Sequence, residues 1–409
     1  MIKIHKLKEI KNSIVFLPEE NNREIKIYHL DDVSIEGENL FYPNAFIYSK
    51  KDKKIYNPLQ EKTMSLQNIA EEEFFHLPTS EQNKVEENPL FYFVYNTDNY
   101  YHFLYDTVPY LISFLHLKNQ IKDLKLLVNY PNVAKNEFYT FFLEFLKLLE
   151  IKKTDLLVVD KNTLYKKIFI SSSYTHGRDP NLAPRKEVYQ LFKSIVNKVK
   201  KEYKNKNELC EKIYISRRTW VHNDFSNLGT NYTSRRKMVN EDELVERLVN
   251  KGYKEVFTEN LDMIEKIFLF SSAKEIIGSI GGGLANALFC DHNVKLQIIV
   301  SPTFFEINER FQHCFKDLKV SYFLDTEHIE KQKHKKFIRV LSHDNKVGEI
   351  LEVLGEKVLI SYLDNKVAGW NSLVPHKKKL YDKKDISLLD GGLNSMWKVN
   401  LEKFIKEVE

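Results

Sequence analysis

Apolar residues recur with two different spacings along this chain, and these spacings predict where strands and helices lie. Residues 90–95 are continuously apolar, as in a buried strand, and from Asn99 apolar residues recur at helical spacing through Leu117. Further strand patterns cover residues 124–129, 155–159 and 167–171, and an apolar helix is predicted over 137–149. Strands and helices that alternate at this spacing indicate βαβ units with a parallel sheet.

A second alternating series follows a long charged helix that begins after Pro184 and ends near Lys204. Its strands are predicted at residues 212–216, 254–257, 275–278 and 296–300, and its helices at 241–250, 262–271 and 284–289. This order is typical of a Rossmann-like lobe. Beyond a basic linker near residues 331–336, residues 348–366 alternate as in a hairpin and predict a small SH3-like barrel.

The pattern therefore predicts an α/β protein of two Rossmann-like lobes and a small all-β domain. We expect the first lobe over residues 1–190, the second over 205–330 and the β domain over 337–400. Residues 1–90 mix short β-like runs with polar stretches and specify little of the first lobe. A chain of 409 residues is long enough for two or more domains of ordinary size.

Composition and charge narrow the functional classes. A hydrophobic content of 43% supplies enough apolar surface for sizeable cores. The formal net charge is only +5, so basic residues are largely matched by acidic ones and nucleic-acid binding is not indicated. Three cysteines without metal-ligand spacing, no signal-peptide pattern and no run of 18 apolar residues favour a cytoplasmic protein. Peripheral contact with an inner membrane stays open.

A glycine cluster follows a predicted strand and opens a predicted helix, in the order Gly278-Ser-Ile-Gly281-Gly282-Gly283-Leu-Ala-Asn286. Backbone N–H groups in such a turn approach a phosphate closely, which favours an anion site. Close helix–sheet packing is the alternative explanation of the glycines. A dinucleotide fingerprint needs a glycine where Asn286 stands and an acidic residue on the next strand, so nicotinamide and flavin cofactors are not expected.

Basic residues follow the first strand of the same lobe. Arg217 and Arg218 are expected at its carboxyl end, the edge where open α/β sheets bind ligands, and the guanidinium fork suits phosphate oxygens. A second basic run at residues 234–237 lies in a polar stretch that suits a loop over a diphosphate. Asn240 is either a ligand-binding residue or an N-cap that forms a capping box with Glu243.

In the first lobe, His102 and Asp106 are four residues apart on one face of a predicted helix. Such a pair can act as a general base and its orienting acid, and packing of a histidine into an aromatic helix is the alternative. His176, Arg178 and Glu259 follow predicted strands on loops, where ligand-binding residues are common.

Five blocks of the sequence, in this order, resemble glycosyltransferase family 61, the DUF563 group. The blocks are residues 101–109, 215–218, 240–241, 259 and 278–289, and the resemblance extends over about residues 90–315. Two positions depart from the family pattern. Ile280 stands where many relatives have histidine, and Lys266 stands where they have glutamine.

The resemblance implies a GT-B-like fold, with two Rossmann-like lobes facing a cleft, and an inverting transfer without an obligatory metal or cofactor. The donor is expected to be a nucleotide-sugar, UDP-linked, bound by the second lobe through Arg217, Arg218, Asn240, Glu241, Glu259, Gly281, Gly282, Gly283 and Asn286. The first lobe presents the acceptor, with Asp106 or His102 as the base. Tyr101, His176 and Arg178 are expected on the acceptor side.

Bacterial relatives of this kind are associated with capsule or lipopolysaccharide synthesis, which implies a growing surface glycan as the acceptor. A non-catalytic nucleotide-binding or scaffold protein of the same fold is the alternative, because of Ile280 and Lys266. Formation of a homo-oligomer stays open. The sequence does not resolve whether a hexosyl, pentosyl or N-acetylhexosaminyl group is transferred.

Overall fold

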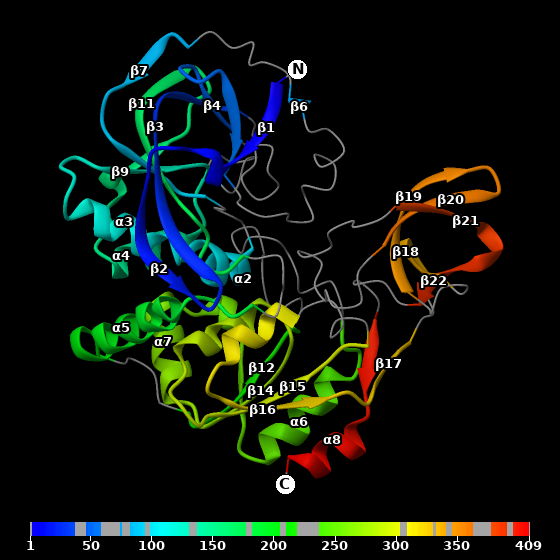
Figure 1. The fold of residues 1–409 in the computed structure, drawn as a ribbon. Coiled ribbons are helices and arrows are strands. Elements are labelled where there is room, and N and C mark those ends of the chain that lie inside the picture. The colour runs from blue at the N-terminus through cyan, green and yellow to red at the C-terminus, as the bar shows by residue number, and fades with distance from the viewer. Residues whose placement is uncertain are drawn as a thin grey trace. The chain divides into compact units, whose positions relative to one another are not determined.

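The chain forms two compact units, each built on its own sheet (Figure 1). The computed structural model describes residues 2–36, 46–58, 74–75, 82–94, 99–130, 137–176, 182–204, 210–218, 237–302, 309–329, 333–340, 346–362, 378–390 and 396–408. The first unit is formed mainly by Met1–Arg178 and Leu182–Glu202, and the second mainly by Tyr203–Ser226 and Thr230–Glu409. Both combine strands with helices, which confirms the predicted α/β class.

The first unit is organised around a mixed sheet of 11 strands, in the order β10-β9-β8-β11-β3-β4-β5-β1-β6, with β2 beside β3 and β7 beside β11. The strands are β1 Ile2–Lys6, β2 Ser13–Glu20, β3 Arg23–Glu36, β4 Phe46–Ser49, β5 Lys54–Asn57, β6 Phe74–Phe75, β7 Lys84–Glu86, β8 Leu90–Tyr92, β9 Lys125–Val128, β10 Leu156–Val158 and β11 Thr163–Ser171. The predicted parallel pairing holds for β10, β9, β8 and β11. The sheet continues antiparallel from β11 through β3 and β4 to β5, and β5 pairs parallel with β1. Strand β2 also pairs antiparallel with β3.

The helices of this unit are α2 Tyr100–His102, α3 Tyr110–Lys118, α4 Thr140–Leu148 and α5 Lys186–Glu202. Between α2 and α3, the chain widens into a π-helical segment, η3 Phe103–Thr107, which the sequence did not predict. Pro109 follows directly, and a proline has no N–H to continue the regular i→i−4 ladder. The amide of Val108 donates instead to Phe103 O, five residues back, at 2.9 Å. Such π-bulges occur often at functional sites.

The second unit contains a fully parallel five-stranded sheet in the order β13-β12-β14-β15-β16. The strands are β12 Lys212–Ile215, β13 Lys254–Val256, β14 Glu275–Ser279, β15 Lys295–Ile299 and β16 Lys319–Phe323. In chain order this is 2-1-3-4-5, the order of doubly wound sheets, whose strand sequence reverses between β12 and β14. Ligands of such sheets bind beyond the carboxyl ends of the strands at that reversal.

Helices and short 3-10 segments connect these strands: α6 Glu241–Asn250, η6 Thr258–Asn260, α7 Met263–Ser272, η7 Gly282–Phe289 and η9 Glu309–Phe315. The range of α6 is the predicted one. The helix expected over residues 284–289 is a 3-10 helix that starts two residues earlier. Asp262 caps α7 with the Glu265 amide and side chain in a reciprocal capping box.

The C-terminal end of the chain completes the core of this second unit. Strand β23 Trp397–Val399 pairs antiparallel with β17 Thr326–His328, and helix α8 Leu401–Glu407 follows. Trp397 is 1% exposed and Phe404 is fully buried, both in one cluster with residues of α6 and of the parallel sheet. The range predicted for the β domain, 337–400, thus includes a strand that belongs to the second lobe, because Trp397 needs a large apolar core.

A separate antiparallel sheet lies in the sequence between β17 and β23. Its strands are β18 Lys333–Val340, β19 Lys346–Leu354, β20 Lys357–Tyr362, β21 Lys378–Asp382 and β22 Ile386–Asp390, in the order β21-β20-β19-β18-β22. The predicted hairpin corresponds to β19 and β20, which pair across the turn at Gly355. The sheet is therefore an insertion into the second lobe and not a terminal tail.

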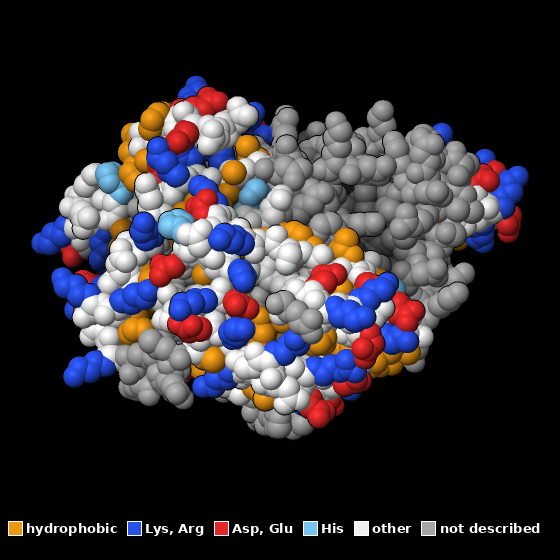
Figure 2. Space-filling model, turned by 90° about the horizontal axis from the view of Figure 1, so that it is seen from below, with side chains coloured by type: hydrophobic (Ala, Val, Ile, Leu, Met, Phe, Trp, Pro, Cys, Tyr) orange, Lys and Arg blue, Asp and Glu red, His pale blue; other side chains and the backbone are white. Residues whose placement is uncertain are grey.

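Charged side chains of both signs intermix on the face shown in Figure 2, in keeping with the small net charge. Within the described ranges, no helix is long and apolar enough to cross a membrane.

Candidate functional site

His102 and Asp106 form a buried contact pair at the π-bulge of the first unit. The Nδ1 atom of His102 lies 2.7 Å from Oδ2 of Asp106. The Asp106 side chain is fully buried and the His102 side chain is 6% exposed. An ionised carboxylate only accepts hydrogen bonds, so the proton of this contact lies on His102 Nδ1. The predicted pair is thus an orienting carboxylate and an imidazole whose other nitrogen, Nε2, can accept a proton.

A loop after β11 brings further polar groups to the same carboxylate. Thr175 donates a hydrogen bond from Oγ1 to Asp106 Oδ1 at 2.9 Å, and His176 Nε2 lies 3.7 Å from the same oxygen. The sequence indicated His176 as a candidate, but it gave no signal for Thr175, a common residue 69 positions away from Asp106. Asp106 therefore interacts with two imidazoles and one hydroxyl.

Ser173 fixes the orientation of the His176 ring. Its Oγ accepts hydrogen bonds from the amides of Thr175 at 3.2 Å and His176 at 2.9 Å. The same hydroxyl lies 3.2 Å from His176 Nδ1, so Ser173 and His176 are joined by both backbone and side-chain contacts.

Tyr101, another candidate of the first lobe, packs against neighbouring aromatic rings. Tyr101 is 4% exposed and stacks on Tyr105, with ring centroids 5.7 Å apart and an interplanar angle of 13°. Tyr101 also contacts the His102 ring, at 4.9 Å between centroids. It thus packs beside the dyad, and an acceptor-side role stays a prediction. Arg178 lies outside the described residues.

In the second unit, Arg217 and the glycine loop meet at the reversal point of the parallel sheet. Arg217 follows β12, and its Nη1 donates to the carbonyl of Ile280 at 3.2 Å, just after β14. A Cβ on Gly281 would overlap this same Nη1 atom. Gly281 has an extended φ of 173°, which any residue can adopt. The glycine is therefore required because it has no side chain, and not because of its backbone conformation. The guanidinium is thereby held at the edge where such sheets bind ligands.

The side chain of Glu241 holds the segment that carries Arg217 by accepting hydrogen bonds from it. It is 2% exposed, and its Oε1 accepts hydrogen bonds from Tyr214 Oη at 2.8 Å, Ser216 Oγ at 3.3 Å and Arg217 N at 2.8 Å. Burial raises the pKa of this carboxyl, and the donors at Arg217 and Tyr214 only partly oppose the rise. Its other oxygen, Oε2, is buried and accepts no hydrogen bond from the described residues.

Two predicted donor-binding residues are engaged by the protein itself. Arg218 forms a two-pronged ion pair with Glu255, at 2.6 and 2.7 Å, and also contacts Asp242 at 2.8 Å. The capping box predicted at Asn240 is wrong. Asn240 precedes α6, but its side chain bonds to the backbone N and O of Val399 on β23, at 3.1 and 2.8 Å. The approach of the C-terminal strand provides these partners, which the sequence did not indicate.

Some glycines of the loop are explained by close helix–sheet packing, the alternative to an anion site. A Cβ on Gly283 would lie 2.9 Å from Ile215 Cγ2, and one on Gly278 would lie 3.1 Å from Ile215 Cβ. Asn286 is fully buried and donates from Nδ2 to Gly283 O at 2.9 Å, which holds the first turn of η7. Close packing therefore accounts for Gly278 and Gly283. The ligand roles of Gly281, Gly282 and Asn286 stay predictions.

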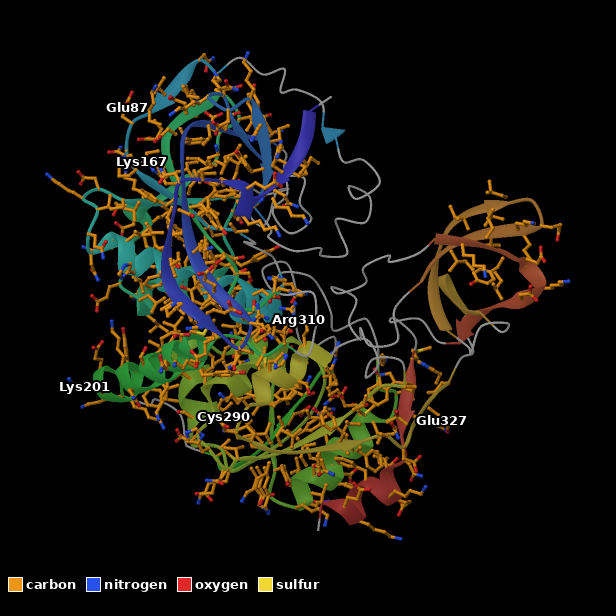
Figure 3. The ribbon with its side chains drawn as sticks, in the orientation of Figure 1. Glu87, Lys167, Lys201, Cys290, Arg310 and Glu327 are labelled. Atoms are coloured by element: carbon orange, nitrogen blue, oxygen red, sulfur yellow. The ribbon has the colours of Figure 1, made fainter. Side chains whose placement is uncertain are left out.

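Two further charged residues lie on neighbouring elements of the second unit. Glu259 lies on η6, directly after β13, and its buried Oε1 accepts no hydrogen bond from the described part of the chain. Arg310 opens η9, which packs against η7, and is 7% exposed (Figure 3). The sequence analysis missed Arg310, because only the tertiary fold brings η9 to the helix of the glycine loop. Among the described residues, no cluster of three or more His, Cys, Asp or Glu side chains could hold a metal ion.

Comparison with known proteins supports an assignment of this part of the chain. The sequence model of the family described as Glycosyltransferase 61 matches residues 100–297. The match includes the His102–Asp106 pair at its start and the glycine loop near its end. No curated protein matches the chain. Residues 100–297 therefore carry the domain of glycosyltransferase family 61.

Proposed function

We propose that the protein is an inverting glycosyltransferase of GT-B architecture that moves a sugar from a nucleotide-sugar, UDP-linked, to a growing capsule or lipopolysaccharide glycan. The observation that carries the proposal is the 2.7 Å contact between His102 Nδ1 and Asp106 Oδ2, inside the region matched by the family. In this proposal the enzyme is cytoplasmic and acts at the inner membrane face. The inserted β18–β22 sheet would be an SH3-like module.

His102 is the proposed catalytic base. Asp106 is fully buried, so its carboxylate is poorly placed to meet an acceptor hydroxyl, whereas it is well placed to orient the imidazole. In an inverting transfer the acceptor oxygen attacks the anomeric carbon as the bond from that carbon to the diphosphate breaks. His102 Nε2 takes the hydroxyl proton, and Asp106 stabilises the imidazolium that results. The nucleoside diphosphate leaves with the electron pair of the broken bond.

The second lobe is proposed to hold the donor. The Arg217 guanidinium lies at the carboxyl edge of the sheet, beside the glycine loop, where it suits the negative charge of a diphosphate. Buried carboxylate oxygens of Glu241 and Glu259 lack hydrogen-bond donors among the described residues, and hydroxyls or N–H groups of a nucleoside could supply them. Arg218 already has two carboxylate partners and is a weaker candidate.

A non-catalytic nucleotide-binding protein of the same fold is the alternative, since Ile280 and Lys266 depart from the family pattern. Ile280 is 6% exposed and contributes its carbonyl, not its side chain, to Arg217, so a different side chain at this position leaves that contact intact. The buried His102–Asp106–Thr175 network has no evident purpose in a protein that only binds nucleotides.

Thermal-shift measurements with UDP-, GDP-, CMP- and ADP-linked sugars, each with and without magnesium, test donor binding, because a ligand of the folded state raises its stability. We expect a rise with UDP-sugars. A transfer assay with the responding donor and a panel of glycan acceptors then compares the wild type with His102→Gln. Donor binding without transfer to any acceptor would favour the scaffold alternative, and no response to any nucleotide-sugar would contradict both.

A further inference from the structure

We propose that Arg23, on strand β3, is a positioning residue for the catalytic dyad: its guanidinium holds the loop that places Thr175 and His176 against Asp106. The catalytic consequence of this inference rests on the function proposed above. Arg23 lies far outside residues 100–297, so the family match assigns it no role. It also lies in the N-terminal part of the chain that the sequence left unspecified.

The guanidinium of Arg23 is buried and surrounded by backbone carbonyls. The residue is 5% exposed. Its Nε donates to Ala183 O at 2.7 Å, and its Nη2 donates to Thr175 O at 2.8 Å and to Leu182 O at 3.1 Å. Its Nη1 donates to His176 O. One side chain thus binds both ends of the loop that leaves β11 and returns toward α5.

Only an arginine can make this set of contacts. The four carbonyls accept from three different nitrogens, Nε, Nη1 and Nη2, which a guanidinium holds in a fixed fork of five N–H groups. A lysine has three donors on one nitrogen and cannot span the same acceptors. Carbonyls left without donors in a buried site are unfavourable, so we expect residues 175–176 and 182–183 to shift toward other partners.

The same two residues that Arg23 holds by their carbonyls direct their side chains to Asp106. Thr175 Oγ1 donates to Asp106 Oδ1 at 2.9 Å, and His176 Nε2 lies 3.7 Å from that oxygen. Ser173 Oγ contacts the His176 ring at Nδ1, at 3.2 Å. Thr175 and His176 thus carry both carbonyls bound by Arg23 and side chains that lie near Asp106. A shift of these two carbonyls therefore moves the groups around the dyad.

Arg185 provides a matched control. It is 4% exposed, also anchors the β2–β3 hairpin, and donates from Nη1 to Pro18 O at 3.0 Å and Arg23 O at 3.1 Å. Its Nε and Nη2 pair with Glu187 at 3.0 Å. Within the described ranges, its guanidinium donates to neither the Thr175 nor the His176 carbonyl. If loss of any buried arginine disturbed the dyad, substitution of Arg23 and of Arg185 would have the same effect. If Arg23 positions the dyad, only substitution of Arg23 should have this effect.

The first test measures the His176 ring directly and does not depend on catalysis. The full chain with ¹⁵N-labelled histidine is studied by NMR, and His176 is assigned with a His176→Gln variant. We expect one dominant tautomer of His176 in the wild type and the same tautomer in Arg185→Lys. In Arg23→Lys we expect both shifts to move toward the average of the two tautomers. Wild-type shifts in folded Arg23→Lys, or equal changes in both variants, would overturn the proposal.

The second test follows transfer. We expect about a tenfold lower kcat in Arg23→Lys with an unchanged KM for the nucleotide-sugar, and less than a twofold change in Arg185→Lys. Should Arg23→Lys not fold, Arg23→Ala is studied with millimolar methylguanidinium, which should restore at least part of the lost kcat and the wild-type His176 shifts. Absence of any rescue in a folded protein counts against the proposal. Absence of transfer in the wild type would contradict the proposed function alone, because the NMR result stands by itself.

Discussion

Gly281 and the guanidinium of Arg217 occupy adjoining space at the carboxyl edge of the parallel sheet, so that a Cβ on the glycine would overlap Nη1 of the arginine. The same Nη1 donates to the carbonyl of Ile280, the residue before the glycine. Two blocks of sequence about 60 residues apart thus depend on each other for their shape. The absent side chain of Gly281 makes room for a cation where a diphosphate is proposed to bind.

Replacement of Gly281 by alanine should therefore displace Arg217 and weaken binding of the nucleotide-sugar. We expect about a tenfold rise in Kd, equivalent to about 1.4 kcal/mol, measured by calorimetry. Gly278→Ala is the control, because its Cβ would meet Ile215 and Leu284 at 3.1 Å but no arginine. That variant should lose about 1–3 kcal/mol of stability through overpacking, with Kd unchanged. Equal affinities of the two variants would remove Gly281 from the donor site.

Asp106→Asn should abolish most of the transfer activity and leave donor binding intact. An amide cannot stabilise the imidazolium of His102, and general-base catalysis contributes about 10²- to 10⁴-fold to a rate. His102→Gln should lose a similar factor, and the double variant little more, since the two residues act as one unit. The assay compares kcat and donor Kd in all three. Asp155→Asn, which weakens a partly buried contact with Lys118 at 2.7 Å, should retain wild-type kcat.

Glu241→Gln should change how stability depends on pH. Burial raises the pKa of Glu241, so the folded state holds this proton more tightly than the unfolded state does. Stability therefore falls as the pH rises from the ordinary carboxyl value of about 4.5 toward the raised one. Glutamine does not ionise, and its oxygen can still accept from Arg217 N. In melting curves from pH 4 to 8, the Tm difference between variant and wild type should become more positive across that window.

The control for this measurement is Glu243→Gln, on the exposed side of the same helix, where the ion pair with Arg247 is solvent-accessible. Its Tm difference from the wild type should stay small and nearly flat, as for other exposed pairs. A flat difference for Glu241→Gln as well would mean that the buried carboxyl titrates as it does in the unfolded chain.

Phe404→Ala should destabilise the second unit although it lies five residues from the C-terminus. The side chain is fully buried and packs edge-on against Phe323, with centroids 5.0 Å apart. Loss of a buried phenylalanine costs about 3–5 kcal/mol, measurable by urea unfolding. Leu380→Ala, at a position 47% exposed on the β18–β22 sheet, should change stability by less than about 0.5 kcal/mol. A small effect of Phe404→Ala would mean that the C-terminal segment is dispensable for this core.

Local sequence patterns predicted much of the second unit. Helix α6 has the predicted bounds, and β12, β13, β14 and β15 lie within one residue of the predicted strands, whereas β16 was not predicted. Strong apolar alternation and short connections leave few other arrangements for such segments. The donor-side residues follow from this pattern, because carboxyl ends of parallel strands meet at one edge and bring Arg217 to the glycine loop.

Prediction was weaker where the partners of a segment are distant in sequence. Strand β3 pairs with β11, which lies more than a hundred residues away in the sequence, and its Arg23 donates to four carbonyls within residues 175–183. For Asn240 the sequence left a ligand role and a capping role open, and its side chain instead bonds to Val399, 159 residues later. No local pattern encodes such contacts, since each depends on two surfaces that meet only after folding.

The sequence by itself determined the α/β class, the order of the strands and helices in the second unit, and the family blocks from His102 to Asn286. These features follow from the short-range spacing of apolar residues and from residue types, such as glycine, that favour particular local conformations. Tertiary structure alone decided that Asp106 is fully buried among His102, Thr175 and His176, that Glu241 supports Arg217, and that the C-terminal strand closes the second core. The physical reason is that burial and hydrogen-bond partners are set by long-range packing, which assigns the same residue type to a ligand site in one place and to the core in another.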